Sequence, residues 1–452
     1  RDRDPFDAND DGFSEITHVN NVTFGGRAFH RTGNRSKIMA DFFTISDVRR
    51  GGNKFDSQEH EADIAEAVEH RIVSAAITYE QYLREKDLLT LFASGQLVDR
   101  DSYYGAEQSL KDYGFTESDA YSVGAQYTVL LDKSNIVAGL ETRGENLTDT
   151  KIGYPDLENA VIEDGEIVEI PHVADLLIAD QRSATTGIYA QYEYRLLRWQ
   201  FSAGARFEHF RIDDVAENGG EKTGDVISPR ATVKYDAAKN LQFRISYAQG
   251  YRAPQIFDED LHIETSGSRQ VLHRNDPGLE QETSHSFMAS VDYTIDGAAN
   301  TFNVLAEGFY TILQDPFVNE FGEPDENGVV VYTRTNAGKG ATVRGVNFEM
   351  NYAVGRNLTA YGGITFQQSR YEDPQEFSER SFFRAPNSYG FLTLNWDASK
   401  KFGVSATTNY TGKMLVPYFG NTLENPEAGE LRKSDSFVDV GLKANYKIKL
   451  NG

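Results

Sequence analysis

Hydrophobic and polar residues alternate with a period of two along most of the chain. In residues 199–208 the odd positions are apolar and the even positions are polar or small, and residues 241–247 and 346–352 alternate in the same way. Successive side chains of a β-strand point to opposite faces, so each segment predicts a strand with one apolar and one polar face. A soluble β-sandwich would give the same local pattern, so alternation alone leaves the fold open.

The connections between these segments narrow the choice. Very short turns and long polar loops follow one another in strict alternation. Transmembrane β-barrels of outer membranes have this asymmetry, with short periplasmic turns and long extracellular loops. The pattern therefore predicts an all-β fold, a transmembrane antiparallel β-barrel. The short turns are Arg31–Arg35, Arg84–Asp87, Leu131–Asn135, Arg195–Arg198, Asp236–Asn240, Asp296–Asn300, Gly355–Asn357 and Asp397–Lys401; the long loops are Arg49–Ala62, Asp101–Ser118, Asn146–Gln181, Asp213–Asp225, Arg252–Gln281, Leu313–Gly340, Tyr371–Pro386 and Leu415–Lys433.

The number of strands predicts a partial barrel. About 17 segments reach or exceed the roughly 9–11 residues that a tilted membrane strand needs. The first, Phe13–His30, and the last, Ser436–Leu450, both run toward the end of the short turns. Bacterial barrels close with an even number of strands, and plugged transporters have about 22. We therefore expect residues 1–452 to be a partial barrel that lacks an N-terminal plug domain, the first strands and the last strands.

Composition excludes several other classes. No stretch of eighteen or more apolar residues is present, which excludes helical membrane spans. The chain has 45 Lys and Arg against 69 Asp and Glu, a net charge of -24, so nucleic-acid binding is not expected. The absence of cysteine excludes disulfides and thiol chemistry. No nucleophile elbow, phosphate-binding loop or HExxH motif is found, and an enzyme is not predicted.

Two segments at loop–strand junctions carry a family resemblance. Ser246–Pro254 resembles the "GFRAP" segment of TonB-dependent receptors, and Asp276–Thr283 resembles their "NPxLKPE(T/S)" segment, which opens the next strand. Three residues of the second segment depart from the family pattern: Asp276 stands for Asn, Glu280 for Lys and Gln281 for Pro.

Further segments extend the resemblance over essentially the whole chain. Phe383–Asn387 resembles the later "RxP" segment, and Arg49–Asn53 with Glu59–Ile64 is similar to siderophore- and cobalamin-type receptors of Bacteroidota. The resemblance implies a receptor in the outer membrane of a Gram-negative bacterium, surrounded by outer-membrane lipid. It implies active import of a scarce nutrient of the ferric siderophore, haem or cobalamin class. A plug outside these residues would couple the barrel to the TonB-type energising complex, and a surface lipoprotein is a further candidate partner.

Candidate ligand-binding residues lie around these motifs. Arg252 belongs to an Arg–Ala–Pro segment, which also reads as a structural corner because proline ends a strand. His262 and His273 occupy the position between the two motifs where haem receptors carry an axial ligand, although the neighbouring Asp258–Asp260 would repel haem propionates. Tyr103 and Tyr104 could stack on an aromatic ligand, or pack within a loop or an interfacial girdle.

The segment Asp7–Gly12 matches the first half of a calcium-binding loop. Asp7, Asn9 and Asp11 would supply hard oxygen ligands, and Glu15 could add a carboxylate. The twelfth position of the motif is His18 instead of Glu. The alternative is an acidic extracellular turn ended by glycine. No cofactor is expected to be required beyond this candidate calcium ion.

Three other functions remain open. A passive porin or structural barrel shares the alternation and the asymmetric connections. A peptide or glycan importer differs only in its loops, and loops carry no transferable code for their ligand. A soluble all-β enzyme or propeller is the third alternative, but a propeller repeat of roughly 40–50 residues is not found.

Overall fold

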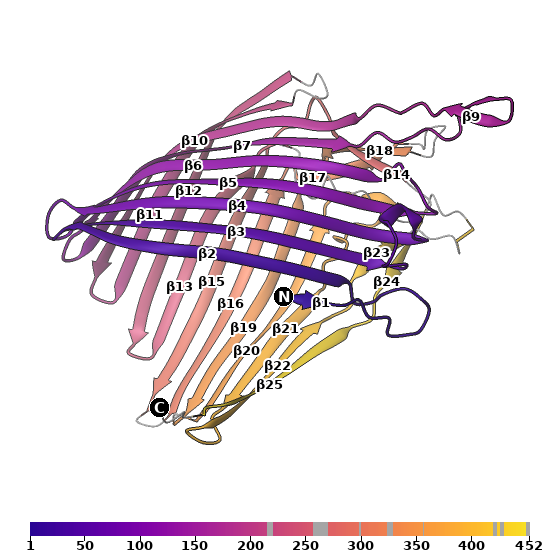
Figure 1. The fold of residues 1–452 in the computed structure, drawn as a ribbon. Coiled ribbons are helices and arrows are strands. Elements are labelled where there is room, and N and C mark those ends of the chain that lie inside the picture. Colours follow the sequence, from indigo (N-terminus) through magenta and orange to yellow (C-terminus); the bar gives the residue numbers. More distant parts are fainter. Residues whose placement is uncertain are drawn as a thin grey trace.

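The structure is a computed structural model, and it describes residues 1–214, 220–255, 270–297, 300–322, 329–355, 357–418, 423–424 and 429–448. Eighteen strands of these residues form one antiparallel sheet, which curves strongly around a central space (Figure 1). Each long strand pairs with the next long strand along the chain. The strands are β1 (Asp2–Arg3), β2 (His18–Gly33), β3 (Ser36–Gly52), β4 (Ile64–Tyr82), β5 (Asp87–Ala106), β6 (Tyr113–Leu130), β7 (Ser134–Lys151), β10 (Leu176–Leu196), β11 (Trp199–Asp214), β12 (Gly220–Ala238), β13 (Leu241–Arg252), β15 (Glu282–Asp296), β16 (Asn300–Gln314), β19 (Ala341–Val354), β20 (Leu358–Tyr371), β21 (Ser388–Trp396), β22 (Phe402–Thr411) and β25 (Phe437–Tyr446).

The predicted all-β antiparallel architecture is confirmed, and so is the alternation of short and long connections. The total of 22 strands and the position of a plug stay predictions. Within the described residues no ladder joins β25 to β2, so the sheet is open between these two edges (Figure 1). No helix of the described part is long and apolar enough to cross a membrane.

The long connections carry small elements of their own at one end of the sheet. These are the hairpin β8 (Val161–Glu163) with β9 (Glu166–Glu169), the sheet of β14 (Gln270–Asn275), β18 (Val329–Asn336) and β17 (Phe317–Phe321), the hairpin β23 (Leu415–Tyr418) with β24 (Glu430–Lys433), and the short helices η1 (Glu59–Glu61) and η3 (Glu376–Ser378).

Several strands are longer than the sequence pattern predicts. The predicted loop Asp101–Ser118 is reduced to the residues between Ala106 and Tyr113, because β5 and β6 continue into it. In the same way β7 and β10 continue into the predicted loop Asn146–Gln181. Both faces of these strand ends are polar, so the alternation that marks a strand is lost although the backbone ladder continues.

The two faces of the sheet differ in chemistry. On β11 the odd-numbered residues from Trp199 to Phe207 form an apolar outer row, and large side chains in it are exposed. This row spans nine residues, which matches the length of a tilted membrane strand. Trp199 faces Tyr235 of β12 with a ring-centroid distance of 4.4 Å, as in the aromatic girdle of a membrane barrel. The even-numbered residues of β11 point to the opposite, inner face.

Candidate functional site

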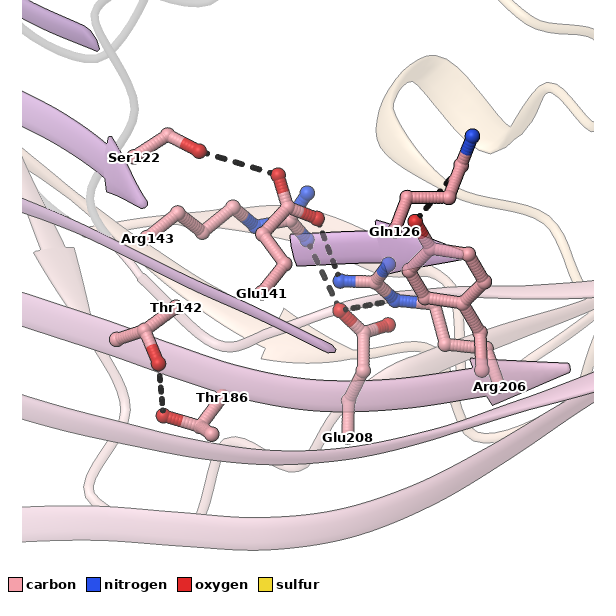
Figure 2. Close-up of polar contacts among 9 residues, drawn as sticks. Ser122, Gln126, Glu141, Thr142, Arg143, Thr186, Arg206 and Glu208 are labelled. Atoms are coloured by element: carbon pink, nitrogen blue, oxygen red, sulfur yellow. Dashed lines mark hydrogen bonds and ion pairs between the residues drawn. The ribbon is translucent and has the colours of Figure 1, made fainter. Parts of the chain in front are cut away.

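A network of charged side chains covers the inner faces of β7 and β11. Arg206 lies between two carboxylates: its Nη2 donates to Glu141 Oε2 at 2.9 Å, and its Nε lies 2.9 Å from Glu208 Oε1 (Figure 2). Arg143 approaches the same Glu208 oxygen at 3.4 Å, and the Ser122 hydroxyl donates to Glu141 at 3.1 Å. The two arginines and two glutamates balance in charge, so the wall is highly polar without a local excess of either sign.

Glu208 is the centre of this network and is only 4% exposed. Register explains how the network forms: Gly187 of β10 faces both Glu208 of β11 and Glu141 of β7. Glycine has no side chain, so the charged groups of β7 and β11 meet across it. A Cβ at Gly187 would lie 2.9 Å from Glu208 Cγ and 3.0 Å from Arg206 Nη2.

The segment that begins the loop after β13 packs against the same wall. Tyr251 interacts with the Glu208 carboxylate, and its ring stacks on Phe210 at a centroid distance of 6.0 Å. Phe210, Ile212 and Val226 form a buried cluster against which Tyr251 and Ala253 pack. The Tyr–Arg–Ala–Pro segment is therefore held on the inner face of the barrel wall.

An inner cavity of about 590 Å³ lies between residues 251–255 and the inner faces of β4 to β10. We call it the inner cavity. Its lining is rich in hydroxyl groups and includes Arg143 and Glu145. It can therefore donate and accept hydrogen bonds toward a polar ligand or a protein segment in the lumen. The hydroxyl-bearing lining residues are Ser74, Ser94, Tyr121, Ser122, Ser183, Thr185 and Tyr251.

Arg252 is placed at this cavity, but it also has a structural role. It is the last residue of β13, and its guanidinium carbon lies 5.9 Å from the centroid of the Phe317 ring. Pro254, two residues later, is buried. The strand thus ends where the sequence predicts a corner, and the role of Arg252 in binding ligand stays a prediction.

The two candidate histidines are not brought together by any described contact. His262 lies outside the described residues. His273 belongs to β14, and its backbone faces Tyr332 of β18 in a parallel ladder. A histidine ligand for haem therefore stays a prediction.

Tyr103 and Tyr104 lie in strand β5 and not in a loop as expected. Tyr103 is 1% exposed, its hydroxyl donates to the Ser109 carbonyl at 2.9 Å, and its ring lies 4.7 Å from that of Tyr113. These contacts give Tyr103 a packing role in the structure. Stacking of either tyrosine on a ligand stays a prediction.

Three of the four candidate calcium ligands lie together. One oxygen each from Asp7, Asp11 and Glu15 falls within 4.8 Å of the others. The Gly12 N–H donates to Asp7 Oδ2 at 2.8 Å, and this bond holds the pKa of Asp7 below its usual range. The Asn9 side-chain oxygen instead accepts the Asp11 N–H at 3.0 Å.

The other motif segments form structural corners next to the strands they were expected to open. In the segment before β15, Leu279 is buried and Lys222 Nζ donates to the Asp276 carbonyl at 2.7 Å. In the segment before β21, the Pro386 carbonyl accepts a hydrogen bond from Gln367 Nε2 at 3.1 Å.

The inner network itself was not predicted. Glu141, Arg206 and Glu208 each stand at polar positions of alternating strands, which is the only signal the sequence holds for them. Glu141 and Arg206 are 65 residues apart, so their contact follows from the register of β7, β10 and β11.

Comparisons with known proteins agree with this geometry. A family profile described as "TonB dependent receptor-like, beta-barrel" matches residues 3–452. No protein of curated function matches the chain by sequence. The fold is similar to the ferripyoverdine receptor of the outer membrane of Pseudomonas aeruginosa, with a TM-score of 0.71 and 12% identity over 96% of this chain and 60% of that one. It is also similar to the copper transporter OprC (TM-score 0.70, 11% identity, 96% and 65%). The ferric-catecholate import receptor Fiu from E. coli K12 is a third similar structure (0.68, 13%, 98% and 70%).

At these identities the likeness concerns the fold. The chain spans 65% of the length of the copper transporter and 60% of that of the ferripyoverdine receptor.

Proposed function

The chain belongs to the family of TonB-dependent receptor β-barrels, and on that basis we propose that it is the barrel of an energised importer of metal chelates. The proposed substrates are a ferric siderophore, haem or a cobalamin, carried across the outer membrane of a Gram-negative bacterium. The structures similar to this chain are named as transporters or receptors of iron, copper and siderophores. A TonB-type complex would supply the energy through a plug domain.

The observation that carries this proposal is the inner cavity between residues 251–255 and the polar wall. An importer needs a lumen whose surface hydrogen-bonds both to a passing ligand and to the segments that fill the space. Hydroxyl groups, Arg143 and Glu145 meet that need. The apolar outer row, including Phe207 and Ile188, supports placement of the same strands in a lipid bilayer.

Uptake in cells tests the proposal. The complete receptor would be expressed in a strain that lacks its own receptors, and accumulation of radiolabelled ferric siderophores, haem and cobalamin would be measured with and without a protonophore. We expect accumulation of one chelate class that the protonophore abolishes. Diffusion that the protonophore does not change would contradict energised import and support a passive porin. Energised uptake of peptides or glycans alone would contradict the metal-chelate class.

We also propose that the loop of residues 4–17 binds calcium through Asp7, Asp11 and Glu15. The proposal is supported by the three converging carboxylates and by the Gly12 N–H that orients Asp7. Isothermal titration of the purified protein with CaCl₂ tests it, with Asp11→Asn and Glu15→Gln as variants. Equal heats for these variants and for the unchanged protein would contradict this site.

A further inference from the structure

A second cavity, of about 760 Å³, lies on the face of the sheet opposite to the charge network. We call it the outer cavity. His18, Arg50, Glu69, Asp101 and Tyr113 line it. Each stands an even number of residues along its strand from an exposed apolar side chain of the outer row. The pairs are His18 with Val22, Arg50 with Phe42, Glu69 with Val73, Asp101 with Leu97 and Tyr113 with Tyr121.

The ladders that join β2 to β6 contain no register shift between these residues. An even separation in an unbroken strand places two side chains on the same face. The outer cavity therefore opens on the side that faces lipid, and the inner cavity opens on the other side.

The loop between β3 and β4 folds over this outer face and forms the roof of the cavity. Arg50 Nη1 donates to the Ser57 carbonyl at 2.7 Å and lies 3.7 Å from Glu59. The Tyr113 hydroxyl of β6 donates to Glu59 at 3.3 Å. These contacts tie the loop to β3 and β6, so the cavity is a built feature of the fold.

The height of the cavity matches that of lipid headgroups. Glu69 stands four residues beyond Val73 along β4, and Asp101 four residues beyond Leu97 along β5. At about 3.3 Å per residue, both carboxylates lie about 13 Å along the strand beyond the last large apolar side chain. A lipid whose chains lie along the outer row would bring its headgroup to this level.

The lining carries both signs of charge, with carboxylates in excess. Asp4, Asp56, Glu59, Glu69 and Asp101 face Arg49 and Arg50. This excess disfavours a purely anionic headgroup and favours one with a positive group. The Nε of Arg50 is buried without a hydrogen-bond partner in the described part of the chain, and a phosphate oxygen would supply the acceptor it lacks.

We propose that the outer cavity binds the headgroup of a membrane lipid that carries a protonated amine beside a phosphate. Glu69 and Asp101 would accept hydrogen bonds from the amine, and Arg50 would donate to the phosphate. This lipid site is separate from the import pathway, because it lies on the opposite face of the sheet.

Lipid retention measures this directly. The complete receptor would be reconstituted in vesicles of equal parts phosphatidylcholine, phosphatidylethanolamine and phosphatidylglycerol, released into detergent and analysed by native mass spectrometry. We expect selective retention of phosphatidylethanolamine. The double variant Glu69→Gln/Asp101→Asn should retain about tenfold less of it, since each carboxylate makes a charge-assisted bond.

The matched control is Glu117→Gln/Asp119→Asn, which removes two exposed carboxylates of β6 on the same outer face but outside the cavity. It should retain phosphatidylethanolamine unchanged. Heat-modifiable migration on gels would show that both variants fold. Equal losses in the two variants, or equal retention of the three lipids, would overturn the proposal. Displacement by free phosphoethanolamine without any lipid preference would also overturn it.

Discussion

Asn53 and Asp63 are hydrogen-bonded to each other twice. Asn53 Nδ2 donates to Asp63 Oδ2 at 2.7 Å, and the Asp63 N–H donates to Asn53 Oδ1 at 3.0 Å. The pair closes the ten-residue loop that roofs the outer cavity, and Lys54 Nζ adds a third bond to Asp63 at 2.6 Å. This reciprocal contact joins the two sequence segments that resemble siderophore- and cobalamin-type receptors.

Replacing Asn53 should release this loop. In Asn53→Ala both bonds to Asp63 are lost, and the buried Asn53 position cannot replace them with water as an exposed one would. We expect limited proteolysis to cut within residues 54–62 several-fold faster, while the barrel stays folded. Asn34→Ala, in the turn between β2 and β3, is the control and should leave this cleavage rate unchanged. Equal cleavage of Asn53→Ala and the unchanged protein would show that the pair does not hold the loop.

The same loop should open in acid. The Lys54 ammonium, followed by Asn53, holds the pKa of Asp63 below its usual range. A carboxyl with a lowered folded-state pKa stabilises the fold fully above its unfolded pKa of about 3.9, and this stabilisation is lost as pH falls through the folded-state pKa. Hydrogen exchange of residues 54–62 should therefore be constant above about pH 4 and accelerate below it. In Asp63→Asn this acid-dependent step should disappear. If it persists, another group controls the opening.

Gly52 should tolerate no side chain. Its φ of +107° is unfavourable for other residues, and a Cβ there would lie 2.0 Å from the Ile64 carbonyl oxygen. Gly52→Ala should cost about 1–3 kcal/mol through backbone strain alone, and more through the clash. Thermal unfolding in detergent measures the loss. Gly26→Ala is the matched control, because a Cβ at Gly26 meets nothing within 4 Å. Comparable losses for the two variants would contradict this account.

Glu208→Gln should weaken the barrel wall. The substitution keeps the shape of the side chain but removes the charge that faces Arg206 and Arg143. Loss of one partner of a buried ion pair typically costs about 3 kcal/mol or more. Urea unfolding of the reconstituted protein should show this loss. Thr142→Val, which removes a hydroxyl on the outer face of β7, should change stability by about 0.5 kcal/mol or less. A neutral Glu208→Gln would mean that the network contributes no net stability.

Charge on the outer row should be costly. Ile188 of β10 is 59% exposed on this face, where lipid is expected. Ile188→Arg should cost about 2–4 kcal/mol if this position lies near the middle of the bilayer. Gln191→Arg, on the inner face of the same strand, should cost clearly less. Unfolding of both variants in the same lipid decides the matter, and equal costs would contradict the assignment of the two faces.

The order of strands and turns could be predicted from the sequence because one face of each strand meets lipid and the other meets the lumen. The outer row from Trp199 to Phe207 shows this most clearly. The same reasoning fails beyond the apolar band. Asp99 and Asp101 are polar although they point outward, so β5 ended too early in the prediction.

The site was harder to predict because it depends on register. The calcium-loop candidates are neighbours in sequence, so a local motif was sufficient to bring Asp7, Asp11 and Glu15 forward. The contact of Glu141 with Arg206 spans 65 residues and arises only when β10 is placed between β7 and β11. Polar alternation identifies such residues as facing the lumen but does not identify their partners.

The length of the strands has a consequence for how the receptor meets its surroundings. β10 has 21 residues, which is about 70 Å of extended chain, whereas the apolar band of a membrane barrel is only about 25 Å tall. Even with a tilt of about 40°, the wall would rise some 25 Å above the hydrocarbon region. The entrance would then stand clear of the lipid headgroups, as the rim of a well stands above the ground. A nutrient could be captured in open solvent, and large molecules that recognise the cell surface would meet this rim first.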